Sequence, residues 1–106
     1  MPAEWEPQKS VWLIWPYNEK DWPKLFKKIP EVVGKISACL SINQNVNLII
    51  RNLKDKSKIK KIIKKFENKI SNIKFHSIRS NRVWIRDSGP IFLINKKTNN
   101  KIILNF

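Results

Sequence analysis

The sequence predicts an α/β domain in which short apolar strands alternate with amphipathic helices. Two observations support this fold class. Apolar runs rich in β-branched residues recur along the chain, and the segments between the first three runs carry apolar residues three and four positions apart. The resulting order is strand, helix, strand, helix and then three strands, which favours an α/β sheet followed by an antiparallel or mixed hairpin. A chain of 106 residues has room for one domain with a core of its own.

The first predicted strand is the apolar run over residues 11–15, which Pro16 closes. Residues 1–10 precede it and are polar, so we expect them to form an extended leader. After the strand, Asp21 is a residue type that caps helix N-termini, and Pro23 stands where the first helical turn tolerates proline. The chain is therefore predicted to turn from strand to helix near Asp21.

The first helix is predicted over residues 24–40, with a kink or its true start near Ile29, because Pro30 cannot sit inside a regular helix. Its apolar positions are spaced so that they share one face, which we expect to be buried. These positions are Leu25, Phe26, Ile29, Val32, Val33, Ile36, Cys39 and Leu40. Residues 46–50 are then predicted to form the second strand.

The clearest helix is predicted over residues 55–70, where Asp55 or Ser57 caps the first turn. A narrow apolar stripe runs along it, formed by Ile59, Ile62, Ile63, Phe66 and Ile70. Lysines occupy the opposite side, at Lys58, Lys60, Lys61, Lys64 and Lys65. This pattern is typical of an amphipathic helix with one solvent-exposed face.

The last third of the chain is predicted to be mostly extended. Residues 73–78 form the third strand, and residues 91–94 and 101–106 form two more on either side of the polar turn over 96–100. The final strand stops at Phe106 without a polar tail, whereas domain termini are usually exposed and polar. We therefore expect the chain to be truncated after Phe106.

The net charge of +14 comes from 22 Lys and Arg against 8 Asp and Glu. A basic balance of this size is one electrostatic signature of nucleic-acid binding. Only four of the cations are arginines, however, and Lys, Ile and Asn together make up 47 of the 106 residues. All three amino acids have A/T-rich codons. We therefore interpret the lysine excess chiefly as base-composition bias at solvated positions.

Several classes of protein are excluded by simple counts. A single cysteine, Cys39, cannot form an intramolecular disulfide or a cysteine-rich metal site. No apolar run approaches the ~20 residues that a membrane-spanning helix needs. The N-terminus lacks the basic and apolar regions of a secretory signal. The sequence thus predicts a reduced, soluble, cytoplasmic protein without a cysteine-rich metal site or a membrane-spanning helix.

The densest group of polar and aromatic residues lies between Arg82 and Pro90. If residues 83–86 are extended, Trp84 and Arg86 share one face, and Asp87 falls where the strand gives way to a turn. A carboxylate can accept a bidentate hydrogen bond from a guanidinium, and an indole can stack on that cation. Gly89 permits close backbone approach or a positive φ. The alternative is an Arg86–Asp87 surface pair beside a core tryptophan.

Other aromatic and nucleophilic residues allow two interpretations each. Trp12, Trp15, Trp22 and Tyr17 could pack the core and anchor loops, or stack nucleic-acid bases. The lysines lie in other segments, so the interleaving that a base-stacking surface needs is absent. Cys39 lies on the predicted buried helix stripe and is expected in the core. His76, the only histidine, is expected to be structural.

Two segments together resemble a known family. The N-terminal stretch Met-Pro-Ala-Glu-Trp-Glu-Pro, followed by Trp-Leu-Ile-Trp-Pro-Tyr-Asn and Asp-Trp-Pro, is similar to the opening of agmatine deiminases. The downstream stretch Arg-Val-Trp-Ile-Arg-Asp-Ser-Gly-Pro is similar to a motif of the same proteins. The wider group is the bacterial, Porphyromonas-type peptidylarginine deiminase family. The resemblance covers the whole chain but only about the first third of the family's length, so it implies that residues 1–106 are the N-terminal part of an agmatine deiminase-like catalytic domain, truncated after Phe106.

The resemblance implies the first modules of a pentein, the α/β propeller of the guanidino-group-modifying superfamily. It implies hydrolysis of agmatine to N-carbamoylputrescine and ammonia, a step of putrescine and polyamine biosynthesis, without a metal or organic cofactor. In this family the aspartate of the motif grips the guanidinium and its tryptophan lines the pocket, which here are Asp87 and Trp84. Arg86 and Gly89 support them. The expected partner is a small guanidinium substrate, and a full-length form could be a homo-oligomer.

The chain also departs from the family pattern. The family's nucleophilic cysteine, its Gly-His-x-Asp motif and its Glu-Gly-Gly segment do not occur in these 106 residues, and Cys39 and His76 match neither. We therefore expect no catalytic residue here and no activity of this chain alone. Three alternatives stay open: peptidyl-arginine as the substrate, a small basic nucleic-acid-binding module, and a relic that scarcely folds and aggregates through exposed edges and Trp12 and Trp15.

Overall fold

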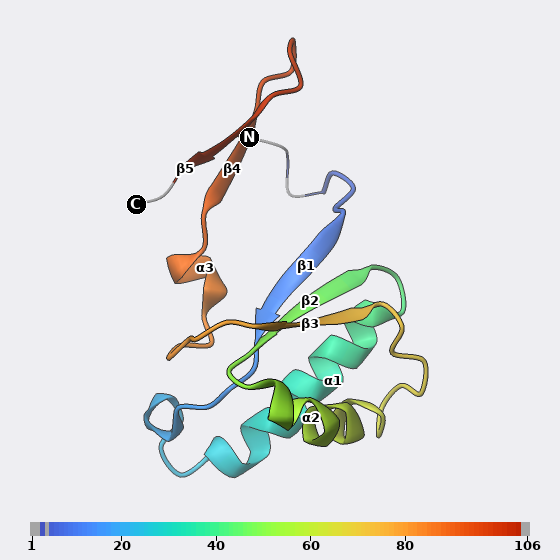
Figure 1. The fold of residues 1–106 in the computed structure, drawn as a ribbon, viewed down its shortest axis with the longest axis vertical. Coiled ribbons are helices and arrows are strands. Elements are labelled where there is room, and N and C mark those ends of the chain that lie inside the picture. Colours follow the sequence, from blue (N-terminus) through green and yellow to red (C-terminus); the bar gives the residue numbers. More distant parts are fainter. Residues whose placement is uncertain (1–2, 4, 105–106) are drawn as a thin grey trace.

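Three parallel strands form the sheet around which the chain is arranged (Figure 1). The computed structural model describes residues 3 and 5–104, apart from the side chain of Ser88. In the sheet, β1 (Ser10–Ile14) and β3 (Ile73–Ser77) flank the central strand β2 (Asn45–Ile50). The predicted strands are confirmed to within one or two residues at their ends.

Two helices connect these strands and cover one face of the sheet (Figure 1). They are α1 (Ile29–Ser41) and α2 (Lys56–Ile63). The connection from β1 to β2 and the connection from β2 to β3 both lead to the next strand in the same direction across the sheet. Because crossovers between parallel strands are right-handed, both helices lie on the same side. The predicted start of the first helix at Ile29 is confirmed, with Pro30 in its first turn, where its missing N–H costs nothing.

The loops before these helices contain short 3-10 segments. These segments are Glu19–Asp21, Phe26–Lys28 and Leu53–Asp55. The prediction that Asp21 caps a helix is wrong, because the side chain of Asn18 caps the first segment by accepting from the Lys20 N–H. Asp21 is thus free for another contact.

The core fills the space between the helices and the facing side of the sheet. Register places Leu13, Leu48 and Phe75 side by side on that side. Leu48 is fully buried. The buried hydrophobic cluster consists of Trp15, Ala38, Val46, Leu48, Ile50, Ile59, Ile63 and Ile73. Burial of Trp15 confirms the interpretation that it packs in the core and contradicts the alternative in which it is exposed, whereas Trp12 is exposed on the other face of the sheet.

The buried side of α1 differs from the predicted one. It is formed by small residues, namely Gly34, Ser37, Ala38 and Ser41. Val32, Ile36 and Cys39 are instead exposed, so the expectation of a core Cys39 is wrong. Small residues allow close helix packing. A Cβ built on Gly34 would lie 2.9 Å from Ile62 Cγ2 of α2.

The second helix is shorter than predicted, because α2 ends at Ile63 and not at Ile70. Phe66, expected in the apolar stripe, is exposed. The lysine side is largely solvent-exposed as predicted. Two lysines still contact the sheet: the Nζ atoms of Lys56 and Lys60 lie 5.5 and 5.9 Å from the ring centroid of Phe75.

The chain then passes through a short helix, α3 (Ile85–Ser88), into an antiparallel hairpin of β4 (Ile91–Ile94) and β5 (Lys101–Leu104). The polar turn is confirmed, and Asn99 takes a positive φ of 56° there. The hairpin extends away from the parallel sheet (Figure 1). It exposes apolar side chains at Ile91, Phe92, Ile94, Ile102, Ile103 and Leu104. The predicted continuation over residues 105–106 lies outside the described residues.

Tyr17 joins the loops that follow β1 and β2. Its hydroxyl donates to Asp55 Oδ2 at 3.1 Å and accepts from the backbone N–H of Arg51 at 3.0 Å. The Arg51 guanidinium lies 4.8 Å from the ring centroid. Burial raises the pKa of the Tyr17 phenol; the Asp55 carboxylate acts in the same direction and the Arg51 N–H against it.

The only tyrosine of the chain is expected to ionise above its ordinary pKa of 10.0 in the folded protein. Because folding favours the neutral phenol, its contribution to stability is complete below pH 10.0 and is lost as the pH rises through the raised pKa. Phenolate absorbance measured against pH gives this value directly. The same titration in concentrated urea is the control and returns the ordinary pKa; a folded-state value at or below it would contradict the prediction.

Candidate functional site

The segment with the predicted site residues forms a helical turn. Residues 85–88 are α3, and Trp84 precedes the turn with φ −78° and ψ 85°. The prediction that residues 83–86 are extended is therefore wrong. The turn closes through a 2.6 Å hydrogen bond from the Gly89 N–H to the Ile85 carbonyl. A Cβ at Gly89 would lie 2.6 Å from that oxygen, so this residue serves close approach, without a positive φ.

The helical turn directs the polar side chains outward. Arg86 and Asp87 are exposed, while Val83 and Ile85 are half-buried. Trp84 is 57% exposed, so it is not a core residue. Within residues 3 and 5–104, the structure records neither an Arg86–Asp87 ion pair nor any other partner for the Asp87 carboxylate. The alternative of a surface pair beside a core tryptophan is thus wrong, and the carboxylate of Asp87 is accessible beside an exposed indole.

A second tryptophan lies against Trp84. The ring centroids of Trp22 and Trp84 are 6.2 Å apart with an interplanar angle of 46°, which is within the usual range for an aromatic pair. Phe26 continues the cluster at 6.4 Å from Trp22. Residue types alone place Trp22 in an N-terminal aromatic patch and give no sign that it pairs with Trp84. Its presence in the Asp-Trp-Pro segment of the resemblance was the one signal that could have linked it to Trp84.

The other aromatic residues do not join this cluster. Trp12 stacks on His76 on the helix-free face of the sheet, with centroids 4.8 Å apart, and His76 Nε2 lies 2.8 Å from Asn47 Oδ1. Trp15 is buried on the helix side, and Tyr17 is engaged by Asp55. The four aromatics of the predicted patch therefore face different directions and offer no continuous base-stacking surface.

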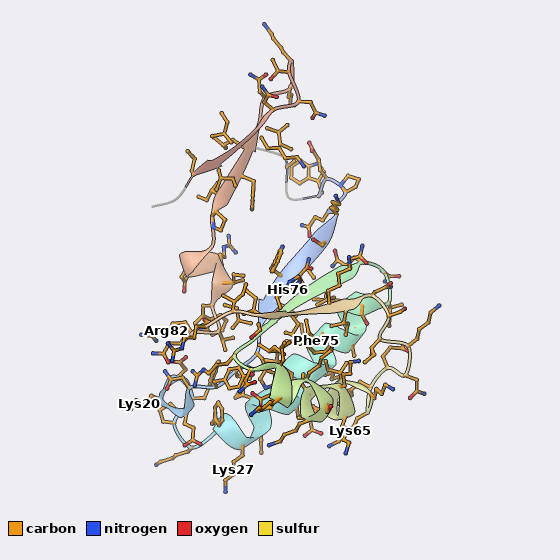
Figure 2. All side chains as sticks on the ribbon, in the orientation of Figure 1. Lys20, Lys27, Lys65, Phe75, His76 and Arg82 are labelled. Carbon is orange, nitrogen blue, oxygen red and sulfur yellow. The ribbon has the colours of Figure 1, made fainter. Side chains whose placement is uncertain are left out.

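The single cysteine and the single histidine lie on opposite sides of the sheet. Cys39 belongs to α1, which covers the helix side. His76 points to the opposite face from Phe75 (Figure 2). A thiol and an imidazole must be within hydrogen-bonding reach to act as a nucleophile and base. These two are not arranged for that chemistry, and the described residues contain no group of three His, Cys, Asp or Glu that could hold a metal ion.

Comparison with known proteins identifies the family to which this chain belongs. The sequence profile of the Porphyromonas-type peptidyl-arginine deiminases matches residues 1–106. The chain belongs to this family. Two of its relatives are the agmatine deiminases of Pseudomonas savastanoi pv. phaseolicola and Pseudomonas aeruginosa LESB58. Both are 29% identical to this deiminase-family chain, with 92% of the chain and 25% of the relative covered.

The fold of this deiminase-family chain also matches a solved structure. The agmatine deiminase of C. jejuni superimposes with a TM-score of 0.77 and 26% identity, over 99% of this chain and 30% of that enzyme. The α/β arrangement is therefore similar to part of an agmatine deiminase. The chain spans about a quarter of the length of the two Pseudomonas relatives. None of the helices in the described part of the chain has both the length and the apolar character to cross a membrane.

Proposed function

We propose that this chain forms the guanidinium-binding wall of an agmatine deiminase-like hydrolase. The observation that carries the proposal is the accessible Asp87 carboxylate beside the exposed indole of Trp84, within a segment that resembles the family's substrate-binding motif. A carboxylate can hold both N–H groups of a planar guanidinium, and the indole face attracts the same cation. Gly89 supports the site because it allows the turn that presents Asp87, and for Arg86 the supporting role is the one that the resemblance implies.

The reaction we propose for the whole protein converts agmatine and water into N-carbamoylputrescine and ammonia, in the cytoplasm. A thiolate attacks the guanidinium carbon, ammonia leaves, and water then cleaves the carbon–sulfur bond. Asp87 orients the guanidinium for this attack but cannot supply the thiolate. Because Cys39 and His76 are held apart by the sheet, we propose that the nucleophile and the proton-transferring group belong to further modules of a pentein, outside these residues.

The proposal predicts binding without turnover. The 106-residue chain, incubated with agmatine, is expected to release no N-carbamoylputrescine, which liquid chromatography of the products detects. In a ¹H–¹⁵N NMR titration, agmatine is expected to shift the indole N–H signal of Trp84, assigned through Trp84→Phe, more than the other four tryptophan signals. Putrescine, which has no guanidinium, is the matched control ligand and is expected to leave that signal nearly unchanged.

Two outcomes would contradict this proposal: product release by the isolated chain, or equal shifts with agmatine and putrescine. A blocked arginine peptide tests the substrate class, because its guanidinium can reach Asp87 while its main chain adds bulk that agmatine lacks. Tighter binding of the peptide than of agmatine would favour peptidyl-arginine deimination, the alternative within the family.

A further inference from the structure

We propose that Asp21 is a positioning residue that, through an ion pair with Arg82, fixes the segment carrying Trp84 and Asp87. Asp21 belongs to the loop after β1, and Arg82 to the loop after β3. Arg82 Nη1 donates to Asp21 Oδ1 at 3.1 Å across a separation of 61 residues. The functional meaning of this pair rests on the proposed function, whereas the positioning itself does not.

The carboxylate of Asp21 is buried, so it depends on the position of its cationic partner Arg82. The side chain of Asp21 is only 6% exposed. Its Oδ1 atom also accepts from Asn18 Nδ2 at 3.1 Å, and its Oδ2 atom is buried without a hydrogen-bond partner in the described part of the chain. A carboxylate that has lost its water needs a nearby cation to offset the cost of desolvation. Arg82 is the cation that the structure places there.

Apart from the ion pair, few hydrogen bonds attach the segment around Arg82 to the rest of the described chain, and one of them runs from the Ile78 N–H to the Ile50 carbonyl at 3.0 Å. Residues 78–84 form no helix or strand between β3 and α3. The Arg51 guanidinium donates to the Ser80 carbonyl at 3.3 Å, and Ser80 Oγ donates to the Arg82 carbonyl at 2.8 Å within the segment. Figure 2 shows Arg82 beside the loop that carries Lys20, where Asp21 follows. The Asp21–Arg82 ion pair is thus the electrostatic contact between residues 78–84 and the loop after β1.

A second contact joins the same two loops. Trp22 follows Asp21 directly and Trp84 lies two residues after Arg82, and their rings are 6.2 Å apart. Asp87 is one helical turn further, with its N–H bonded to the Trp84 carbonyl at 3.3 Å. Displacement of Arg82 would therefore shift both Trp84 and the turn that presents Asp87. The ion pair and the aromatic pair, beside the half-buried side chains of Val83 and Ile85, thus hold the proposed guanidinium-binding side chains in place.

The experiment compares Asp21→Asn, Arg82→Gln and Arg82→Lys with the unmodified chain. Lys65→Gln is the matched control, because it removes the Lys65–Glu31 ion pair, whose side chains are 61% and 56% exposed and which lies on the helix side. The first readout is the circular-dichroism couplet that two close indoles produce, assigned to Trp22 and Trp84 by its loss in Trp22→Phe. Asn is nearly isosteric with Asp and keeps one acceptor oxygen, so Asp21→Asn removes the charge and replaces the other oxygen with an amide NH2 group.

We expect Asp21→Asn and Arg82→Gln to lose most of the couplet, and Arg82→Lys and Lys65→Gln to keep it. Agmatine affinity, from NMR titration, is expected to fall roughly three- to tenfold in the first two variants only. Each of these two variants serves where the other fails to fold, because the Arg82 side chain is 71% exposed and Asp21→Asn leaves no buried carboxylate without its cation. An unchanged couplet in a folded Arg82→Gln would overturn the proposal. If the unmodified chain binds no agmatine, the proposed function fails, and the couplet still decides the positioning role.

Discussion

Replacement of Asp87 by asparagine is expected to weaken agmatine binding about 10- to 100-fold, because a carboxylate that holds a guanidinium makes charge-assisted hydrogen bonds. The amide keeps the shape of the side chain but carries no charge and offers a single acceptor oxygen. Asp87 is exposed and lacks an ion-pair partner among the described residues, so the substitution should leave the fold intact. The dissociation constant is measured by NMR titration of the Trp84 indole signal.

The matched control for this variant is Glu67→Gln. Glu67 accepts from the Lys69 N–H after α2, away from α3, and glutamine can keep that bond. Both substitutions raise the net charge of +14 by one unit, so they alter the long-range repulsion of a dication equally. We expect Glu67→Gln to bind agmatine as the unmodified chain does. Equal weakening in the two variants would mean that Asp87 makes no specific contact with the guanidinium.

The largest expected effect on stability is that of Leu48→Ala, at about 2–5 kcal/mol of unfolding free energy. Leu48 is 0% exposed in the central strand, between Leu13 and Phe75 in register and under the two helices. Removal of its side chain leaves a cavity in the core, and the neighbouring strands and helices would have to move to fill it. Urea unfolding followed by circular dichroism measures the change. For a domain whose total stability is of the order of 5–15 kcal/mol, such a loss is large.

Ile42→Ala is the control for that measurement, since Ile42 is 61% exposed at the C-terminal end of α1. We expect its effect to stay within about 0.5 kcal/mol, as is usual for surface substitutions. If the two alanine variants were equally stable, the packing of the helices on β2 would not be the core of the fold.

Much of the fold could be predicted from the sequence, because its signals are local. Apolar runs rich in β-branched residues predicted the strands, and Pro30 indicated where α1 begins. The buried side of α1 could not be predicted from hydrophobicity, since Gly34 and Ser37 carry little apolar surface and are buried because they allow close packing. Likewise, α3 is one turn held by the contact of Gly89 with Ile85, which is too short for a periodic pattern.

For the candidate site, residue types at fixed spacing made Asp87 and Trp84 chemically suited to a guanidinium but left a surface ion pair as the alternative, and the resemblance to the deiminases was needed to select them. Their neighbours could not be selected in this way. Asp21 appeared to be a helix cap because of its place before Trp22 and Pro23, and its actual partner, Arg82, is 61 residues away. This pairing arises because the parallel strands β1 and β3 end at the same edge of the sheet, on either side of β2. Only the three-dimensional structure shows that the two following loops meet.

The close approach of α1 and α2 at Gly34 has an evolutionary consequence. A methyl group at position 34 would meet Ile62 Cγ2 at 2.9 Å, and that atom is the branch methyl on the Cβ of a helical isoleucine, which has little freedom to move aside, so a smaller residue at position 62 would be needed to make room. The two positions should therefore change together among descendants of this sequence, a larger residue at one accompanying a smaller residue at the other. Covariation between them would record the helix spacing in sequence data alone.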